Sequence, residues 1–154
     1  MFLLFFMGSF NAIAQSVAHV YSNYRNVKMK DLHNLKFFFQ ITNLGNTTDS
    51  FYEKIYLGYD SLAGTDVYFK ILKENKFHSF DNYFTVRYDI GFALSPSDLQ
   101  PSIILNKNDK HTWSAYVYRD YQLRDTGNYI FITNFTGRFS SIATLDTVKI
   151  RVIK

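Results

Sequence analysis

Hydrophobic and polar residues alternate along much of this chain. The clearest case is residues 35–42, in which every second position carries an inward-facing apolar residue: Leu35, Phe37, Phe39 and Ile41. Successive side chains of an extended strand point to opposite faces, so this spacing predicts a strand with one buried face. Residues 147–152 repeat the pattern, with Val148, Ile150 and Val152 inward and Lys149 and Arg151 outward.

Similar short segments recur, separated by residues that favour turns, such as Asn43-Leu44-Gly45-Asn46. We expect about nine strands, including 16–21, 35–42, 51–59, 67–72, 77–80, 83–92, 102–105 and 147–152. Residues 23–34 are predicted to be a polar, irregular connection and 137–144 a loop. No segment shows a convincing helical period. The pattern predicts an all-β fold, a sandwich of two antiparallel sheets.

The pattern of residues 112–135 predicts a strand, a loop and a second strand. Trp113, Ala115 and Val117 share one face of the first strand, and the second opens with Gly127-Asn128-Tyr129. A Tyr two residues after a Gly, just inside a strand, resembles the tyrosine corner of immunoglobulin-like sandwiches. That resemblance implies a buried ring, with its hydroxyl bonded to a backbone group within residues 120–125. It also suggests a positive φ at the glycine.

A family resemblance covers about residues 35–154. The strand and Asn turn at 35–43, then Ile103-Ile104-Leu105, Trp113 and Gly127-Asn128-Tyr129, are similar in order to bacterial immunoglobulin-like modules. The layout also resembles the bacterial intracellular proteinase inhibitor domain. The resemblance implies an immunoglobulin-like antiparallel β-sandwich of about 7–9 strands. No inhibitory loop matches residue by residue, so it implies a fold and no activity.

Composition agrees with one globular domain that has a substantial core. The 154 residues are 47% hydrophobic and 19% aromatic, and aromatic side chains suit half-buried strands. Eight residues are predicted to lie in the core: Phe37, Phe39, Ile41, Trp113, Tyr129, Phe131, Val148 and Ile150.

The first fourteen residues set the expected compartment. An apolar run at 2–7 leads to Ala12-Ile13-Ala14, which resembles the cleavage site of a signal peptide, although no Lys or Arg precedes the run. The run is too short for a permanent bilayer span. The alternative is that it forms the domain's first strand. We therefore expect a signal peptide at 1–14, a single domain at 15–154, and an exported protein, periplasmic or extracellular. The absence of Cys excludes disulfides and a lipidated cysteine.

Motifs that carry chemistry are scarce. His19, His33, His78 and His111 lack the close spacing of metal ligands, and there is no nucleophile elbow or phosphate-binding glycine loop. Asp66, Asp89 or Asp120 would have to meet in space to form a glycosidase pair, and their spacing does not require it. We expect a protein that is not an enzyme and has no cofactor or metal. The net charge of +4 is scattered, which favours acidic partners and does not predict a nucleic-acid surface.

Tyrosines give the strongest indication of a binding function in this sequence. Six are predicted to lie out of phase with the core or in a loop: Tyr52, Tyr56, Tyr68, Tyr116, Tyr118 and Tyr121. Exposed rings stack on sugars or anchor protein interfaces. They also cover sheets by cross-strand packing. Three functions follow as hypotheses: an exported adhesion or protein-interaction module, a carbohydrate-binding module that uses a tyrosine-rich face, and a proteinase inhibitor or small hydrolase.

Overall fold

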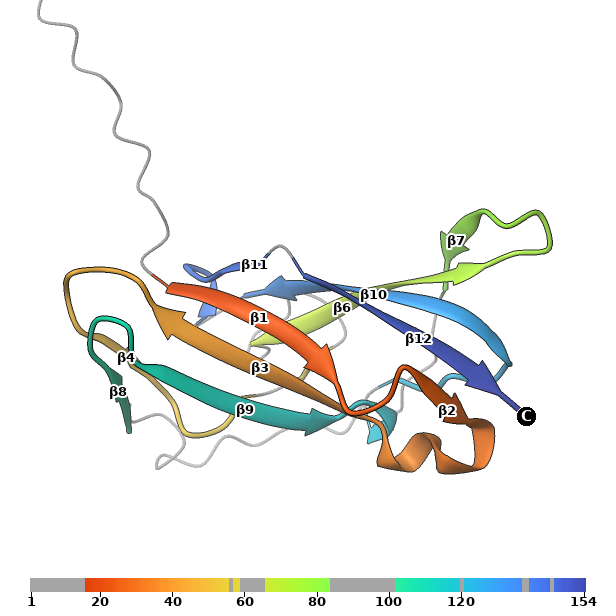
Figure 1. Ribbon diagram of the computed structural model, residues 1–154, viewed down its shortest axis with the longest axis horizontal. Coiled ribbons are helices and arrows are strands. Elements are labelled where there is room, and N and C mark those ends of the chain that lie inside the picture. Colours follow the sequence, from red (N-terminus) through yellow and green to blue (C-terminus); the bar gives the residue numbers. More distant parts are fainter. Residues whose placement is uncertain are drawn as a thin grey trace, which may run out of the picture.

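The computed structural model describes residues 16–55, 57–58, 66–83, 102–119, 121–136, 139–144 and 146–154 (Figure 1). Within them the chain is mostly β-strand, which confirms the predicted all-β class. The 3-10 helices are η1 (Met29–Asn34) and η3 (Val117–Arg119). The strands are β1 (Ser16–Ser22), β2 (Asn26–Lys28), β3 (Lys36–Asn43), β4 (Asp49–Phe51), β5 (Leu57–Gly58), β6 (Val67–Glu74), β7 (Phe80–Asn82), β8 (Ile103–Leu105), β9 (Lys110–Tyr116), β10 (Gly127–Phe135), β11 (Ala143–Thr144) and β12 (Thr147–Ile153).

The described strands form two main sheets and one small pair. The first sheet has the order β11-β1-β3-β9, the second has β2-β12-β10-β6-β5 with β7 beside β6, and β4 pairs with β8. The centre of each main sheet is antiparallel. The edge strands β11, β2 and β5 pair in parallel, so the expectation of purely antiparallel sheets was wrong at these edges. Twelve strand segments lie in the described residues, compared with the seven to nine expected.

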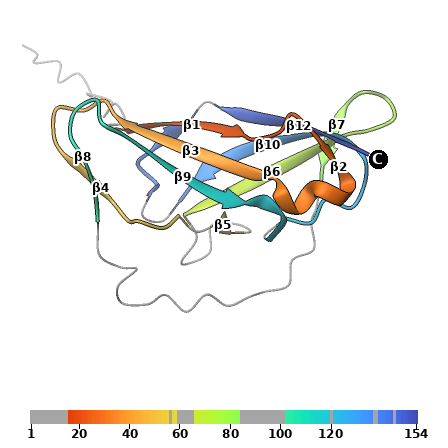
Figure 2. The same cartoon turned by 60° about the horizontal axis from the view of Figure 1, so that its bottom comes forward.

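The two main sheets pack face to face (Figure 2). Aromatic rings fill the space between them. The ring of Phe37 on β3 lies 5.0 Å from that of Phe69 on β6 and 4.9 Å from that of Phe131 on β10, both edge to face. Edge-to-face contacts add to the free energy gained by burying these rings. All eight predicted core residues are buried, which confirms the assigned phases of β3, β9, β10 and β12.

The hydrogen bond predicted for Tyr129 is present. Tyr129 on β10 is buried, and its hydroxyl donates a 2.7 Å hydrogen bond to the carbonyl oxygen of Asp125. Burial raises the pKa of Tyr129, so its hydroxyl stays protonated and available as a donor. Gly127 has a φ of 143°, a conformation that residues with a Cβ rarely adopt. The contact fixes the loop that enters β10.

Four of the predicted segments differ from the structure. Residues 23–34 contain β2 and η1, with Val27 and Leu32 buried, and are not irregular. The predicted strand 51–59 is interrupted, because Phe51 pairs with β8 while Leu57 pairs with β6 in the second sheet. The strand predicted at 77–80 begins only at Phe80, and residues 137–144 include β11. Residues 1–14 and almost all of the strand predicted at 83–92 lie outside the described residues.

Candidate functional site

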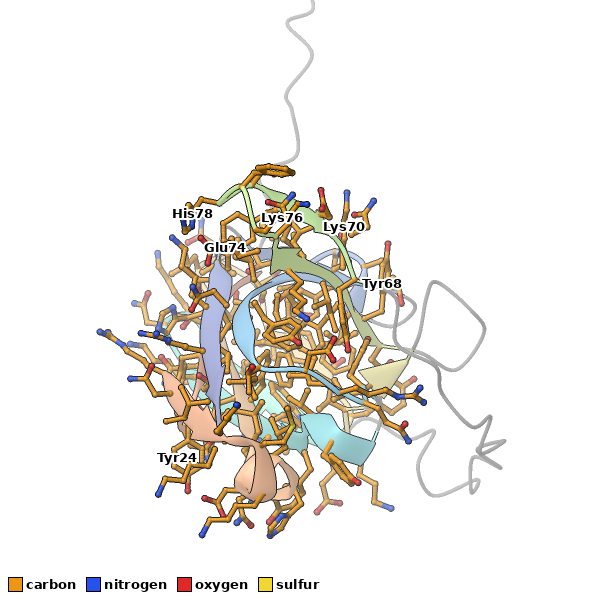
Figure 3. All side chains as sticks on the ribbon, turned by 90° about the vertical axis from the view of Figure 1, so that its right-hand side faces the viewer. Tyr24, Tyr68, Lys70, Glu74, Lys76 and His78 are labelled. Carbon is orange, nitrogen blue, oxygen red and sulfur yellow. The ribbon has the colours of Figure 1, made fainter. Side chains whose placement is uncertain are left out.

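The predicted tyrosine surface is divided among several places. Tyr68 lies on the outer face of β6 in the second sheet (Figure 3), whereas Tyr116 is exposed on β9 in the first sheet and Tyr118 on the adjoining η3. Tyr52 is half-buried beside β4. Tyr56 lies outside the described residues. The described tyrosines therefore do not share one flat face.

Tyr121 was wrongly expected to be exposed. It is 2% exposed, and its hydroxyl accepts a 2.8 Å hydrogen bond from the backbone N–H of Phe69 on β6. Its ring also packs edge to face against Phe69, with 5.4 Å between centroids. Its side chain points inward and satisfies a buried donor of β6. Tyr121 is a structural residue.

Aromatic rings on the outer face of the first sheet stack on one another. Tyr21 lies 5.1 Å from its cross-strand neighbour Phe38 at an interplanar angle of 12°, and 5.4 Å from His19 at 27°. Nearly parallel rings at these distances overlap, so each covers part of its neighbour's face. The ring of Tyr116 likewise has the ammonium of Lys36 at 4.3 Å from its centroid. This arrangement is the cross-strand packing that we considered as the alternative to a sugar-binding surface.

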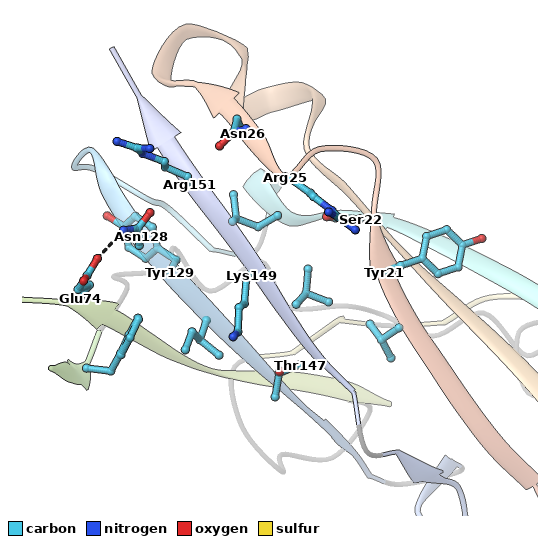
Figure 4. Close-up of a pocket in the computed structure, with 15 residues that line it drawn as sticks. Tyr21, Ser22, Arg25, Asn26, Glu74, Asn128, Tyr129, Thr147, Lys149 and Arg151 are labelled. Atoms are coloured by element: carbon cyan, nitrogen blue, oxygen red, sulfur yellow. Dashed lines mark hydrogen bonds between the residues drawn. The ribbon is translucent and has the colours of Figure 1, made fainter. Parts of the chain in front are cut away.

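A groove crosses the outer side of β12 (Figure 4). Its volume is about 820 Å³, within the range of ligand-binding sites. One wall comes from the end of β1 and the connection to β2, the floor from residues 147–151 of β12 and 128–130 of β10, and the far side from Glu74 and Phe80. We call this feature the β12 groove. It brings together segments that are far apart in the sequence.

The β12 groove carries an excess of positive charge. Its lining includes the exposed cationic side chains of Arg25, Lys149 and Arg151 and one carboxylate, that of Glu74. Glu74 accepts hydrogen bonds from Asn128 and His78, and the bond from Asn128 is the main reason that its pKa lies below the usual value. The carboxylate of Glu74 is thus already hydrogen-bonded to its neighbours. Among the described residues, no salt bridge engages Arg25, Lys149 or Arg151, although the charge of Arg151 also contributes to the lowered pKa of Glu74.

The groove also offers apolar surface beneath its charges. Ile130 is half-buried on the outer face of β10. Val20, Val148 and Ile150 also belong to the lining, but their side chains are buried. The exposed ring of Phe80 stands at the far end. A ligand that combines negative charge with apolar groups would match both kinds of surface.

The sequence predicted the exposure of two groove residues but not the groove. Lys149 and Arg151 were predicted to point outward from the last strand, and they do. Arg25 was not considered, because residues 23–34 were expected to be irregular. Its backbone carbonyl accepts a 2.8 Å hydrogen bond from the N–H of Arg151, which places the two residues side by side. Only this long-range pairing brings the third cation to the site, and no local pattern encodes it.

The described residues do not contain a group of three His, Cys, Asp or Glu side chains arranged to hold a metal ion. His19 pairs with Asp146 at 2.5 Å and His78 with Glu74 at 2.8 Å, both at the surface. Asp66 is buried, and Asp89 and Asp120 lie outside the described residues. None of the helices in the described part of the chain has the length and apolar content needed to cross a membrane.

Comparison of the chain with protein-family models, curated proteins and solved structures finds no match.

Proposed function

We propose that this chain is an exported, non-catalytic binding module whose β12 groove holds an acidic segment of a partner protein. The observation that carries the proposal is the cluster of Arg25, Lys149 and Arg151 around a groove whose single carboxylate is already hydrogen-bonded. Complementary charge steers association and fixes the orientation of a partner. The side chains of Ile130 and Phe80 supply apolar surface that a protein segment, unlike a simple inorganic anion, would cover.

Carbohydrate binding is the second candidate. The observation in its favour is that Tyr116 and Tyr118 are 42% and 49% exposed and follow one another across the junction of β9 and η3. Exposed aromatic rings stack on sugar faces. The ammonium of Lys36 over the Tyr116 ring weakens this alternative, because it occupies one face of the ring. A proteinase inhibitor or a small hydrolase has less support, since no inhibitory loop matches residue by residue and the spacing of the carboxylates requires no pair.

We also infer an immunoglobulin-like arrangement and export from the cell. The contact between Tyr129 and Asp125 is the hydrogen bond expected of a tyrosine corner, and it supports the fold proposal. The parallel pairings of β11, β2 and β5 lie at sheet edges and leave the antiparallel centres in place. Export rests on the signal-like residues 1–14.

The function is tested with protein purified after export. The wild-type chain and Lys149→Glu are each incubated with the extracellular fraction, cross-linked, and analysed by mass spectrometry, while a glycan array is probed in parallel. The matched control is Lys110→Glu, which makes the same charge change on β9, outside the groove. We expect a partner protein whose cross-links map to the β12 groove and are lost only in Lys149→Glu. Strong glycan binding that Tyr118→Ala abolishes, without such cross-links, would replace the proposal by the second candidate.

A further inference from the structure

Among the described strands, one edge of β12 is without a backbone-paired neighbour over part of its length. On one side β12 pairs with β10 from Thr147 to Val152. On the other side the parallel strand β2 pairs only with residues 151–153. Over Thr147–Ile150, no strand in the described part of the chain forms a backbone ladder with that second side, although β1 approaches β12. The β12 groove lies there, and residues 147–150 line it.

The backbone direction shows which groups face the groove. The N–H of Arg151 donates to the carbonyl of Arg25, so it points away from β10. Backbone groups alternate sides along an antiparallel strand, which places the N–H and C=O of Lys149 and Thr147 on the same side as those of Arg151. These donors and acceptors point away from β10, toward the side on which the end of β1 forms the wall of the groove. They can form a ladder with an added strand.

The neighbouring edge of β1 is protected. β11 pairs with β1 only at Val17 and Ala18, and the next outward N–H, that of Val20, donates to the Asp146 carboxylate at 2.8 Å. A charged side chain on an edge is a common device against unwanted strand pairing. Such protection is seen on β1, whereas residues 147–150 of β12 have no comparable cap among the described residues. The two edges therefore differ, and the edge of β12 is the one that can accept an added strand.

The side chains around this edge predict a ligand strand in which acidic and apolar residues alternate. The exposed Lys149 and Arg151 lie on the outer face, and the buried Val148 and Ile150 lie on the inner face of the same strand. A strand beside β12 would present alternate side chains to these two faces. Acidic residues on its outer face would meet the cations, and apolar residues on its inner face would meet the core side.

We propose that the acidic partner segment binds as an added β-strand along Thr147–Ile150, continuing the line of β2, with acidic and apolar residues in alternation. This inference rests on the proposed function, since it gives the manner in which the acidic segment binds. Strand addition derives its affinity from main-chain hydrogen bonds and its specificity from alternate side chains. The unpaired backbone groups of β12 would supply the hydrogen bonds, and the side chains of the β12 groove would supply the specificity.

The test uses the exported protein and a synthetic Asp-Val alternating peptide of about eight residues, somewhat longer than an average strand. Its affinity is compared with that of a Lys-Val peptide and of an Asp-Val peptide N-methylated at alternate residues. N-methylation removes the amide donors along one edge and keeps every charge. We expect the Asp-Val peptide to bind, the Lys-Val peptide not to bind, and N-methylation in the register that faces β12 to weaken binding about tenfold or more.

Amide hydrogen exchange gives the second readout. In the free protein, the amides of Thr147 and Lys149 should exchange quickly, because they face the groove, and those of Val148 and Ile150 slowly, because they bond β10. The Asp-Val peptide should protect Thr147 and Lys149. Protection of these two amides in the free protein would overturn the inference, because another segment of the chain or a second copy would already occupy the edge.

The remaining outcomes separate the two proposals. If both Asp-Val peptides bind equally and no amide becomes protected, the segment lies in the groove by charge alone: strand addition is then wrong and the proposed function stands. If no acidic peptide binds and cross-linked partners do not map to the groove, the proposed function fails and this inference fails with it.

Discussion

Tyr129 and the residues around it show how a few side chains determine a loop. The hydroxyl of Tyr129 bonds the carbonyl of Asp125, Gly127 provides the positive φ between them, and the ring packs against Tyr83 with 5.2 Å between centroids. The sequence predicted the first two features because the Gly-x-Tyr spacing is local. It did not predict that Tyr121 would cap Phe69, since that contact joins residues 52 positions apart.

The Tyr129→Phe substitution removes only the hydroxyl. It leaves the Asp125 carbonyl without its 2.7 Å donor, so we expect the free energy of unfolding to fall by about 1–3 kcal/mol. Chemical denaturation measures the change. Tyr116→Phe, at an exposed position, is the control and should leave stability unaltered. An unchanged unfolding free energy in Tyr129→Phe would show that the corner hydrogen bond contributes no net stability.

The Gly127→Ala substitution tests the backbone of the same corner. At a φ of 143° an added Cβ is strained, and it would lie 3.3 Å from Cε of Lys73, which can move aside. The backbone strain should therefore dominate, with a loss of about 1 kcal/mol or more. Denaturation midpoints that match those of the wild-type protein would contradict the assigned conformation.

The Trp113→Ala substitution tests the phase of β9. The indole is buried, lies edge to face with Phe51 and Phe139, and donates a 3.0 Å hydrogen bond to the carbonyl of Tyr52. Truncation should cost about 3–5 kcal/mol in unfolding free energy, by loss of buried area and creation of a cavity. A loss below about 1 kcal/mol would place the side chain at the surface.

At the scale of elements, strict alternation was the reliable signal. The β3 strand was predicted within one residue because Leu35, Phe37, Phe39 and Ile41 specify one face without ambiguity. The β2 strand and η1 were missed because each of them buries a single residue, Val27 and Leu32, which is too few to show a period. The interrupted strand at 51–59 changes partners between Phe51 and Leu57, and a local pattern cannot report that change.

The link between β6 and β10 predicts a pH effect on stability. Glu74 on β6 accepts hydrogen bonds from Asn128 on β10 and from His78, which hold its pKa below the usual 4.5. A lowered folded-state pKa means that the ionised carboxylate stabilises the fold above pH 4.5. That contribution is lost as the pH falls through the folded-state pKa. Glu74→Gln should therefore flatten the acid limb of a plot of unfolding free energy against pH.

The matched control for this effect is Glu53→Gln, at an exposed glutamate in the segment between β4 and β5. Its acid limb should follow that of the wild-type protein. Equal acid limbs for Glu74→Gln and the wild-type protein would mean that the bonds from Asn128 and His78 do not favour the ionised form.

At the scale of the whole molecule, two sheets provide a core and leave a charged groove at one side. The fold class and the core were predictable from local patterns, because burial alternates along each strand. The candidate site was not, since Arg25, Glu74, Asn128 and Lys149 meet only through strand order and register. The tyrosine surface illustrates the converse: residues alike in sequence are placed on different sheets.

Cleavage of a signal peptide would change the N-terminus and the mass of the exported protein. If residues 1–14 are a signal peptide, the exported protein should begin near Gln15, after the Ala12-Ile13-Ala14 site. Intact-mass analysis of the exported protein measures this directly. A mass that includes Met1 would contradict cleavage and leave the apolar run within the mature chain.

The central claim, an acidic ligand in the β12 groove, is tested most directly by the affinity of the Asp-Val peptide for charge-reversal variants at two salt concentrations. We expect binding that weakens with salt, falls about tenfold (about 1.4 kcal/mol) in Lys149→Glu, and is unchanged in Lys110→Glu. Equal affinity for the wild-type protein and Lys149→Glu, or an equal loss in Lys110→Glu, would contradict it.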